Sequence, residues 1–334
     1  MSAIIKLNLG LFKNWKSYLI IGIIGCLVVY LMQVDMDVLM TNLISGWWKV
    51  ALMIPVSGLA YFTATLAWRY CMNEPGRQIP LRKLFAARHI GESLALINPT
   101  NVIAGDLSKV YFLKQFNIDH REGVLSVLLS RALIILSGIL LSCMAFCLWM
   151  VIYLPGDSMV SFTILPILGI LVVYISWRLV THRRLFIYQL MRFLVHPLRK
   201  YDRVQTALVQ LKRINALIVI KKNQEKGQIV KSWIFSITHW IFGALEFYLL
   251  LLLLGIDIGF SGSLILEMGV TVIKNIGAFI PGQLGIEEIG NKVMLSVVGV
   301  TSPLLWVAVS VFKRTRQLSW LLIGMIMYYF VIHR

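Results

Sequence analysis

The sequence predicts an all-α protein: a single integral membrane domain over residues 1–334, folded as a polytopic bundle of transmembrane helices. The first observation is composition, because 58% of the residues are hydrophobic and only 14% are charged, whereas soluble domains are nearer half apolar and a quarter charged. The second is that several apolar stretches approach or exceed the roughly 18 residues that indicate a transmembrane helix. The third is that Lys and Arg collect in alternate loops, a pattern that orients membrane helices.

Eight apolar stretches are the expected spans, and the loops between them sort by charge. The stretches cover residues 18–34, 47–68, 123–153, 160–180, 229–254, 262–280, 284–300 and 303–332. The loops without Lys or Arg are 35–46, 154–159 and 255–261, and the basic loops are 69–88, 109–121 and 181–231. Since cytoplasmic loops are the basic ones, we expect about eight spans with both termini in the cytoplasm.

The excess of basic residues, 32 Lys and Arg against 15 Asp and Glu, is explained by this topology, and no nucleic-acid-binding module is visible. Residues 181–231 are especially basic and carry apolar residues at helical spacing. We expect a basic amphipathic cytoplasmic segment on the anionic membrane surface, or a loop that only sets topology. Cys143 and Cys147 lie four residues apart with no His or carboxylate nearby in sequence, and no zinc motif is present, so we expect no metal site and no cofactor.

Residues 88–114, "RHIGESLALINPTNVIAGDLSKVYFLK", are apolar enough to enter the bilayer but are interrupted at Asn98-Pro99 and at Gly105-Asp106. Both flanks are basic, so both should lie on the cytoplasmic side. Non-helical backbone is tolerated at membrane depth only where protein or water covers it. We therefore expect a broken helix that enters the membrane and returns, with a full crossing as the alternative.

The stretch "NIGAFIPGQLGIEEIGNKVML", residues 275–295, is a second interruption between apolar runs. Pro281 cannot continue a helix, and Gly282 and Gly285 allow the backbone to turn and to approach a ligand closely. A helix that begins here presents free N–H groups and a positive dipole end inside the membrane, where a phosphate or carboxylate can bind. Glu288, one turn into that helix, could bind a cation or pair with a basic residue. Corresponding interruptions in two halves of a transporter indicate a binding site near the midplane.

Ionisable side chains within apolar stretches are candidate functional residues, because a charge at the bilayer centre costs at least about 2.5 kcal/mol. They are Arg131, Glu246, Glu267, Lys274, Glu287, Glu288, Lys292, Lys313, Arg314 and Arg316. Charged pairs at helical spacing are Arg88 and Glu92, Asp106 and Lys109, and Glu288 and Lys292. Two interpretations follow: structural ion pairs that lock helices together, or a polar cavity that holds a charged headgroup.

Several motifs resemble those of a known family. The run "IPGQLGIEEIGNKVMLSVVGVTSP", followed by an apolar helix with the interruption "KRTR", resembles the C-terminal signature of the lysylphosphatidylglycerol-synthase transmembrane, or flippase-like, family. Upstream, "NPTNVIAGDLSKVYFLKQ" is similar to the family's Pro…Gly-Asp/Glu…Arg segment, and "SVLLSRALIILS" to its Arg-bearing span. The resemblance covers most of the chain and is strongest at residues 275–300.

The motif positions and the buried charges together define the candidate site. The main motif falls on Pro281, Gly282, Gly285 and Glu288, the first motif on Gly105 and Asp106, and the span arginines on Arg131 and Arg314. Gln283 and Lys109 depart from the family pattern, which bears on headgroup specificity rather than on the fold. The candidate substrate-binding residues are Asp106, Lys109, Arg131, Pro281, Gly282, Gly285, Glu288, Lys292 and Arg314, with no catalytic residue and no metal ligand.

The resemblance implies that the chain moves or holds a lipid with a polar headgroup. In multidomain relatives a soluble aminoacyl-transferase domain makes lysylphosphatidylglycerol and the membrane region flips it; we expect here a stand-alone member without that domain. Arg131 and Arg314 would neutralise a phosphate, and Asp106 and Glu288 would orient the headgroup. No ATP-binding motif is visible, so movement would be facilitated or ion-coupled.

Two other functions stay open. A membrane subunit of a lipid-modifying transferase would need a base or an acidic metal site, for which Asp106 with His89 or Glu92 is the best candidate. An ion-coupled transporter of small solutes fits the same spans and charges. The expected partners are membrane lipids with anionic or polyprenyl-linked headgroups, no nucleic acid, and either a second copy of the chain or a lipid-modifying enzyme. The expected location is a bacterial or archaeal cytoplasmic membrane.

Overall fold

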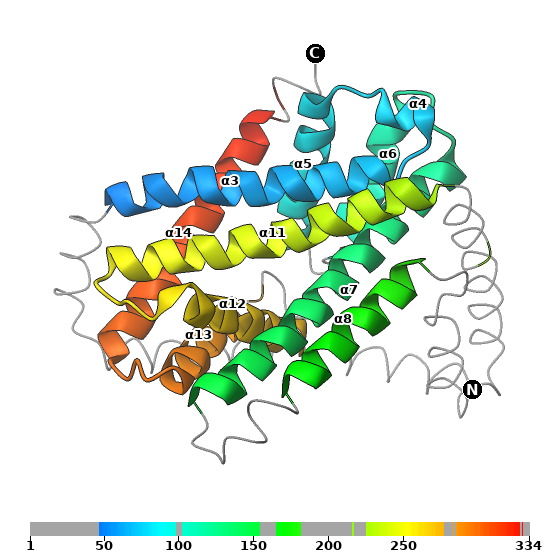
Figure 1. The fold of residues 1–334 in the computed structure, drawn as a ribbon. Coiled ribbons are helices and arrows are strands. Elements are labelled where there is room, and N and C mark those ends of the chain that lie inside the picture. Colours follow the sequence, from blue (N-terminus) through cyan, green and yellow to red (C-terminus); the bar gives the residue numbers. More distant parts are fainter. Residues whose placement is uncertain are drawn as a thin grey trace, which may run out of the picture.

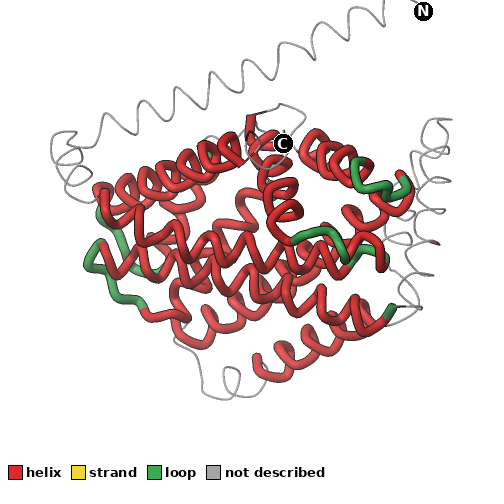
Figure 2. Tube along the Cα trace, turned by 90° about the horizontal axis from the view of Figure 1, so that it is seen from above, coloured by secondary structure: helices red, strands yellow, loops and turns green. Residues whose placement is uncertain are grey.

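The computed structural model describes residues 47–97, 102–153, 165–181, 225–276 and 285–327, together with Ala216, Gln283 and Tyr329. All regular secondary structure in these residues is helical (Figure 2), which confirms the predicted all-α class. Several expectations fall outside the described residues. They concern the span at 18–34, most of the basic segment 181–231, the Asn98-Pro99 break, and Pro281 with Gly282.

The described helices follow the expected apolar stretches closely. They are α3 (Trp47–Tyr70), α4 (Glu74–Arg77), α5 (Leu81–Ile97), α6 (Val102–Lys114), α7 (His120–Tyr153), α8 (Leu165–Thr181), α11 (Lys226–Leu253), α12 (Gly259–Ile276), α13 (Ile286–Val297) and α14 (Pro303–Met327) (Figure 1). Among them, α3, α7 and α11 are long and apolar enough to cross a membrane. The count of eight spans and the cytoplasmic termini remain predictions.

Helices α3 and α11 lie side by side and run in opposite directions through the middle of the molecule (Figure 1). Ser232 Oγ of α11 donates a 2.7 Å hydrogen bond to the carbonyl of Ala67 on α3, and His239 Nδ1 donates one of 2.8 Å to the carbonyl of Ala60. At the other end of the pair, Met53 and Phe247 are buried in the largest apolar cluster. Small and hydroxyl side chains let membrane helices approach closely. We call this contact between α3 and α11 the seam.

Helices α5 and α6 are the two arms of the interrupted segment 88–114, and they pack against each other. Their closest approach is at Gly91 and Gly105: a Cβ on Gly91 would lie 2.8 Å from the Gly105 carbonyl oxygen, and a Cβ on Gly105 would overlap the Gly91 carbonyl. At the open end, the Lys83 ammonium lies 5.4 Å from the centre of the Phe116 ring. The two arms therefore form a hairpin, which is the geometry that a segment entering and leaving the membrane on one side requires.

The same succession of helices occurs twice along the chain. Helices α3, α5, α6 and α7 begin at residues 47, 81, 102 and 120, and α11, α12, α13 and α14 begin at 226, 259, 286 and 303, so the spacing between counterparts is nearly constant. Contacts between the two sets also match, because α5 packs on α14 as α7 packs on α12. This order, spacing and packing are those expected of two duplicated halves that meet at the seam between α3 and α11.

Candidate functional site

The first charged cluster joins the hairpin α5–α6 to helix α7. Arg131 Nη2 of α7 donates a 2.8 Å hydrogen bond to Asp106 Oδ1 of α6, and Arg131 Nε lies 2.7 Å from Oδ2 of the same carboxylate. Lys109 Nζ lies 3.3 Å from Asp106 Oδ1 and 2.8 Å from Glu92 Oε1 of α5. Arg88 Nη2 lies 3.8 Å from Glu92 Oε1. The two close-range pairs expected from helical spacing are both present, and the longer-range contacts connect three helices.

The glycine contact between α5 and α6 is what allows Lys109 to reach across the hairpin. A Cβ on Gly91 would lie 2.9 Å from Lys109 Cε and 3.1 Å from Lys109 Cγ, so the aliphatic stem of the lysine passes directly over the glycine. The ammonium group then meets Glu92 one helical position further along α5. Any larger residue at position 91 would displace that stem.

The first cluster lines a cavity of about 170 Å³ between α3, α5, α6, α7 and α11. Its lining residues are Trp68, Arg88, Glu92, Asp106, Lys109, Val127, Ser130, Arg131, Ile134, Ile135 and His239. Among the described lining residues, three cations face two carboxylates, so this lining carries an excess of positive charge. The volume suits several waters or one small oxyanion group. The lining residue Ile135 is 54% exposed, so one residue of this lining also belongs to the outer surface of α7.

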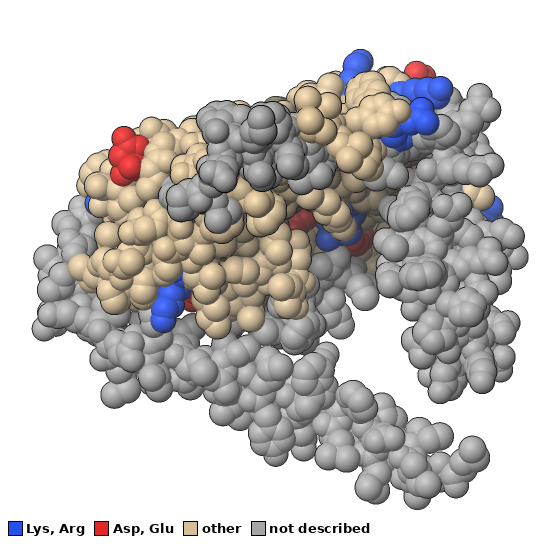
Figure 3. All heavy atoms as spheres, turned by 60° about the horizontal axis from the view of Figure 1, so that its bottom comes forward, with Lys and Arg blue, Asp and Glu red and all other residues tan. Residues whose placement is uncertain are grey.

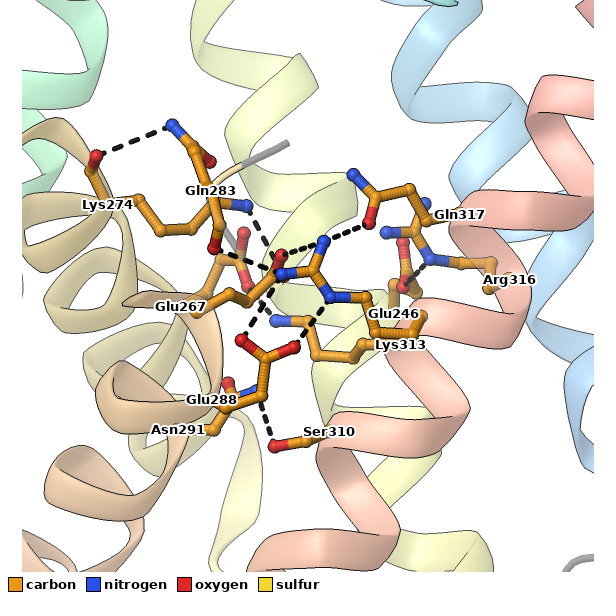
Figure 4. Close-up of polar contacts among 12 residues, drawn as sticks. Glu246, Glu267, Lys274, Gln283, Glu288, Asn291, Ser310, Lys313, Arg316 and Gln317 are labelled. Atoms are coloured by element: carbon orange, nitrogen blue, oxygen red, sulfur yellow. Dashed lines mark hydrogen bonds and ion pairs between the residues drawn. The ribbon is translucent and has the colours of Figure 1, made fainter. Parts of the chain in front are cut away.

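The second charged cluster joins α13 to α14 around Arg314, and Figure 4 labels the residues Gln283 and Glu288 that contact it. Arg314 Nε donates to Glu288 Oε1 at 2.7 Å, and Arg314 Nη2 donates to Glu288 Oε2 at 3.2 Å and to the Gln283 carbonyl at 3.0 Å. Gly285, directly before α13, has a φ of 80°, and Gln283 has a φ of 51°. The turn expected at the glycine is therefore present, and it brings the Gln283 carbonyl to the arginine.

Further ion pairs extend this second cluster to α11 and α12 (Figure 4). They are Lys313 Nζ to Glu267 Oε2 at 3.1 Å, Lys274 Nζ to Glu287 Oε1 at 3.3 Å, and Arg316 Nε to Glu246 Oε1 at 2.7 Å. With the Arg314–Glu288 pair, four cations meet four carboxylates, so these residues are balanced in charge. Such pairing lowers the cost of holding ionised groups between apolar helices.

The candidate site residues thus fall into two separate clusters. Asp106, Lys109 and Arg131 belong to the first, and Gly285, Glu288 and Arg314 to the second. Lys292 is exposed, and its ammonium group lies 5.2 Å from the centre of the Trp306 ring. Pro281 and Gly282 lie outside the described residues.

Tyr61 of α3 contacts both Arg316 of the second cluster and His89 of α5. Its hydroxyl accepts a 3.1 Å hydrogen bond from Arg316 Nη1 of the second cluster. The centre of its ring lies 5.3 Å from the centre of the His89 ring. His89 follows Arg88 in the sequence. The Nε2 atom of His89 lies 2.6 Å from the Trp320 carbonyl of α14. His89 therefore takes part in contacts with α3 and α14.

The sequence reasoning did not place Arg88, Glu92, Tyr61 or His239 in the site. Helical spacing predicts only a pair of Arg88 with Glu92, and Glu92 enters otherwise only as a possible partner of Asp106 in the transferase alternative. His239 is an ionisable side chain within an apolar stretch, which is a usable signal. In the described part of the chain, no group of three or more His, Cys, Asp or Glu side chains is placed to hold a metal ion. On the face drawn in Figure 3, the described surface is mostly uncharged and its charges are confined to a few spots, as suits a protein surrounded by lipid.

Comparison with known proteins gives one result. A family model described as "Lysylphosphatidylglycerol synthase TM region" matches residues 16–324, a range that includes both charged clusters. No curated protein and no solved structure matches the chain.

Proposed function

This chain belongs to the lysylphosphatidylglycerol synthase transmembrane family, and from that premise we propose that it is a lipid translocase that accepts a phosphate-bearing headgroup in the cavity of the first cluster. The observation that carries the proposal is that this cavity, lined by Arg88, Lys109 and Arg131, holds excess positive charge within a bundle of apolar helices. Intramembrane charges of this kind mark the path of a polar substrate.

The outer surface of α7 supports a lipid rather than a free solute. Ile135 lines the cavity and is exposed, and Ile139 and Phe146 are also exposed further along the same helix. Spacings of four and seven residues place the three side chains on one stripe of the helix. A lipid can therefore hold its headgroup in the cavity while its acyl chains lie along this stripe.

In this proposal the second cluster is the corresponding half-site. Glu288 and Arg314 correspond to Asp106 and Arg131 in the first half, and Gly285 supplies the turn before α13. Pro281, Gly282 and Lys292 complete the proposed set. Because its charges are balanced, we assign this half-site a weaker attraction for an anionic headgroup than the first.

A reconstituted translocation assay tests the proposal. The full chain is placed in phosphatidylcholine vesicles that contain fluorescent phosphatidylglycerol, and dithionite bleaching of the outer leaflet measures movement. The informative variant is Asp106→Asn, and its matched control is Asp257→Asn, because Asp257 is exposed in the loop after α11. We expect at least about a tenfold slower rate for Asp106→Asn, from the loss of a charge-assisted contact. Wild-type rates equal to those of empty vesicles would contradict the proposal.

A further inference from the structure

Arg88 is a buried arginine of the first cavity that has an ion-pair partner at long range but no hydrogen-bonded partner among the described residues. It is 7% exposed and its side chain lines the cavity. Within the described part of the chain, its guanidinium makes no hydrogen bond, and its nearest carboxylate oxygen, Glu92 Oε1, is 3.8 Å away. A guanidinium carries five N–H donors and stays charged, so these donors are available to a ligand.

The other arginines between the helices differ from Arg88 because each has a carboxylate at close range. Arg131, Arg314 and Arg316 each have a nitrogen 2.7 Å from a carboxylate oxygen. The carboxylate beside Arg88 is already held by Lys109 Nζ at 2.8 Å. A buried charge without a hydrogen-bonded partner is costly, and a bound anion would remove that cost.

We propose that Arg88 is the primary ligand-binding residue of the cavity and that its ligand is an anionic phosphate group. The planar fork of a guanidinium matches two phosphate oxygens. The lining has three cations against two carboxylates, so one added negative charge balances it. A headgroup that also carries an ammonium group would restore the imbalance and should bind more weakly. This inference rests on the proposed function for its setting and adds the charge class of the substrate.

Equilibrium binding tests the inference with three variants of the full chain. Arg88→Gln removes the proposed contact, Glu92→Gln removes the nearest competing carboxylate, and Arg82→Gln is the matched control, because Arg82 is exposed on the same helix. Native mass spectrometry counts phosphatidylglycerol against phosphatidylcholine bound from mixed micelles. We expect about tenfold weaker phosphatidylglycerol binding for Arg88→Gln, no change for Arg82→Gln, and tighter binding for Glu92→Gln.

The opposite effects of Arg88→Gln and Glu92→Gln on binding distinguish a ligand contact from a structural one. If the Arg88–Glu92 pair only holds the fold, both variants weaken binding together, and that result overturns the inference. Binding to Arg88→Gln that equals the control overturns it as well.

Inorganic phosphate is the second probe, used as a competitor in the same assay. One outcome is that phosphate binds and loses its binding in Arg88→Gln while no lipid preference is seen. That result supports the oxyanion site and identifies its ligand as free phosphate. Arg88-dependent lipid binding without translocation in vesicles supports the inference and rejects the translocase. The two proposals can therefore fail independently.

Discussion

Asp106 and Arg131 form a two-point contact between α6 and α7, and the two residues lie 25 positions apart in the chain. The second half repeats this relationship: Glu288 of α13 contacts Arg314 of α14 at two points, across 26 positions. Each carboxylate lies near the start of the second arm of an interrupted segment, and each guanidinium lies on the next long helix. The two pairs therefore occupy equivalent places in the duplicated halves.

A double-mutant cycle should measure the strength of the first pair. Asp106→Asn and Arg131→Gln should each lower the free energy of unfolding by about 1–2 kcal/mol, because each leaves a partly buried charge with fewer partners. The double variant should cost less than the two single losses together. Unfolding by SDS in mixed micelles gives the free energies, and strictly additive losses would contradict the pairing.

Substitution at the glycine contact should separate α5 from α6. A Cβ in Gly105→Ala overlaps the Gly91 carbonyl, so we expect a loss of about 1–3 kcal/mol from overpacking. The control is Gly169→Ala on α8, where no described residue lies within 4 Å of the added Cβ and where alanine should be neutral or slightly stabilising. Thermal unfolding in detergent compares them, and equal stability of the two variants would refute the close contact.

Lys313, the buried lysine of α14, should stabilise the fold only while its partner Glu267 is charged. Lys313 is 6% exposed, and its ammonium lies 3.1 Å from Glu267 Oε2 and 4.0 Å from the centre of the Phe247 ring. Lys313→Met should cost about 3–5 kcal/mol because it leaves a carboxylate uncompensated. Adding Glu267→Gln should restore most of that stability. Exposed Lys226→Met is the control in the same unfolding assay, and a double variant no more stable than Lys313→Met would count against this account.

Cysteine labelling should report the course of the first hairpin. In a background without the native cysteines, Lys83→Cys and Lys114→Cys should react with an impermeant maleimide from the same side of the membrane, because the open ends of α5 and α6 lie close together. Asp257→Cys, in the loop at the far end of α11, should react only from the opposite side. Labelling of positions 83 and 114 from opposite sides would show that the segment crosses the membrane.

Apolar length was sufficient to locate the long helices. The stretches 47–68 and 229–254 correspond to α3 at Trp47–Tyr70 and α11 at Lys226–Leu253. The differences arise where helices continue into polar residues at the membrane surface, which hydropathy alone excludes. The stretch 262–280 corresponds to α12 at Gly259–Ile276, and residues 277–280 lie outside the described residues.

Charge contacts were predictable only at short range. Helical spacing identified the pair of Asp106 with Lys109, but the contacts of Asp106 with Arg131 and of Glu288 with Arg314 depend on how separate helices pack. Spacing also assigned Glu92 to Arg88, whereas the folded hairpin brings Lys109 a full ångström closer to that carboxylate. The N–H donors of Arg88 make no hydrogen bond with the described residues because Lys109 competes with Arg88 for Glu92. That competition depends on how α5 and α6 pack, for which the sequence carried no signal.

The seam between α3 and α11 has a consequence for the origin of the chain. His239 of α11 lies 179 residues after Ala60 of α3, close to the 178 residues between the starts of α5 and α12 and the 183 between those of α7 and α14, and these two residues are in contact. Contact between equivalent positions is what a two-fold axis produces in a symmetric dimer. The chain therefore resembles two fused copies of a four-helix ancestor whose dimer interface became the seam. Two fragments separated between α8 and α11 should accordingly reassemble when they are produced together.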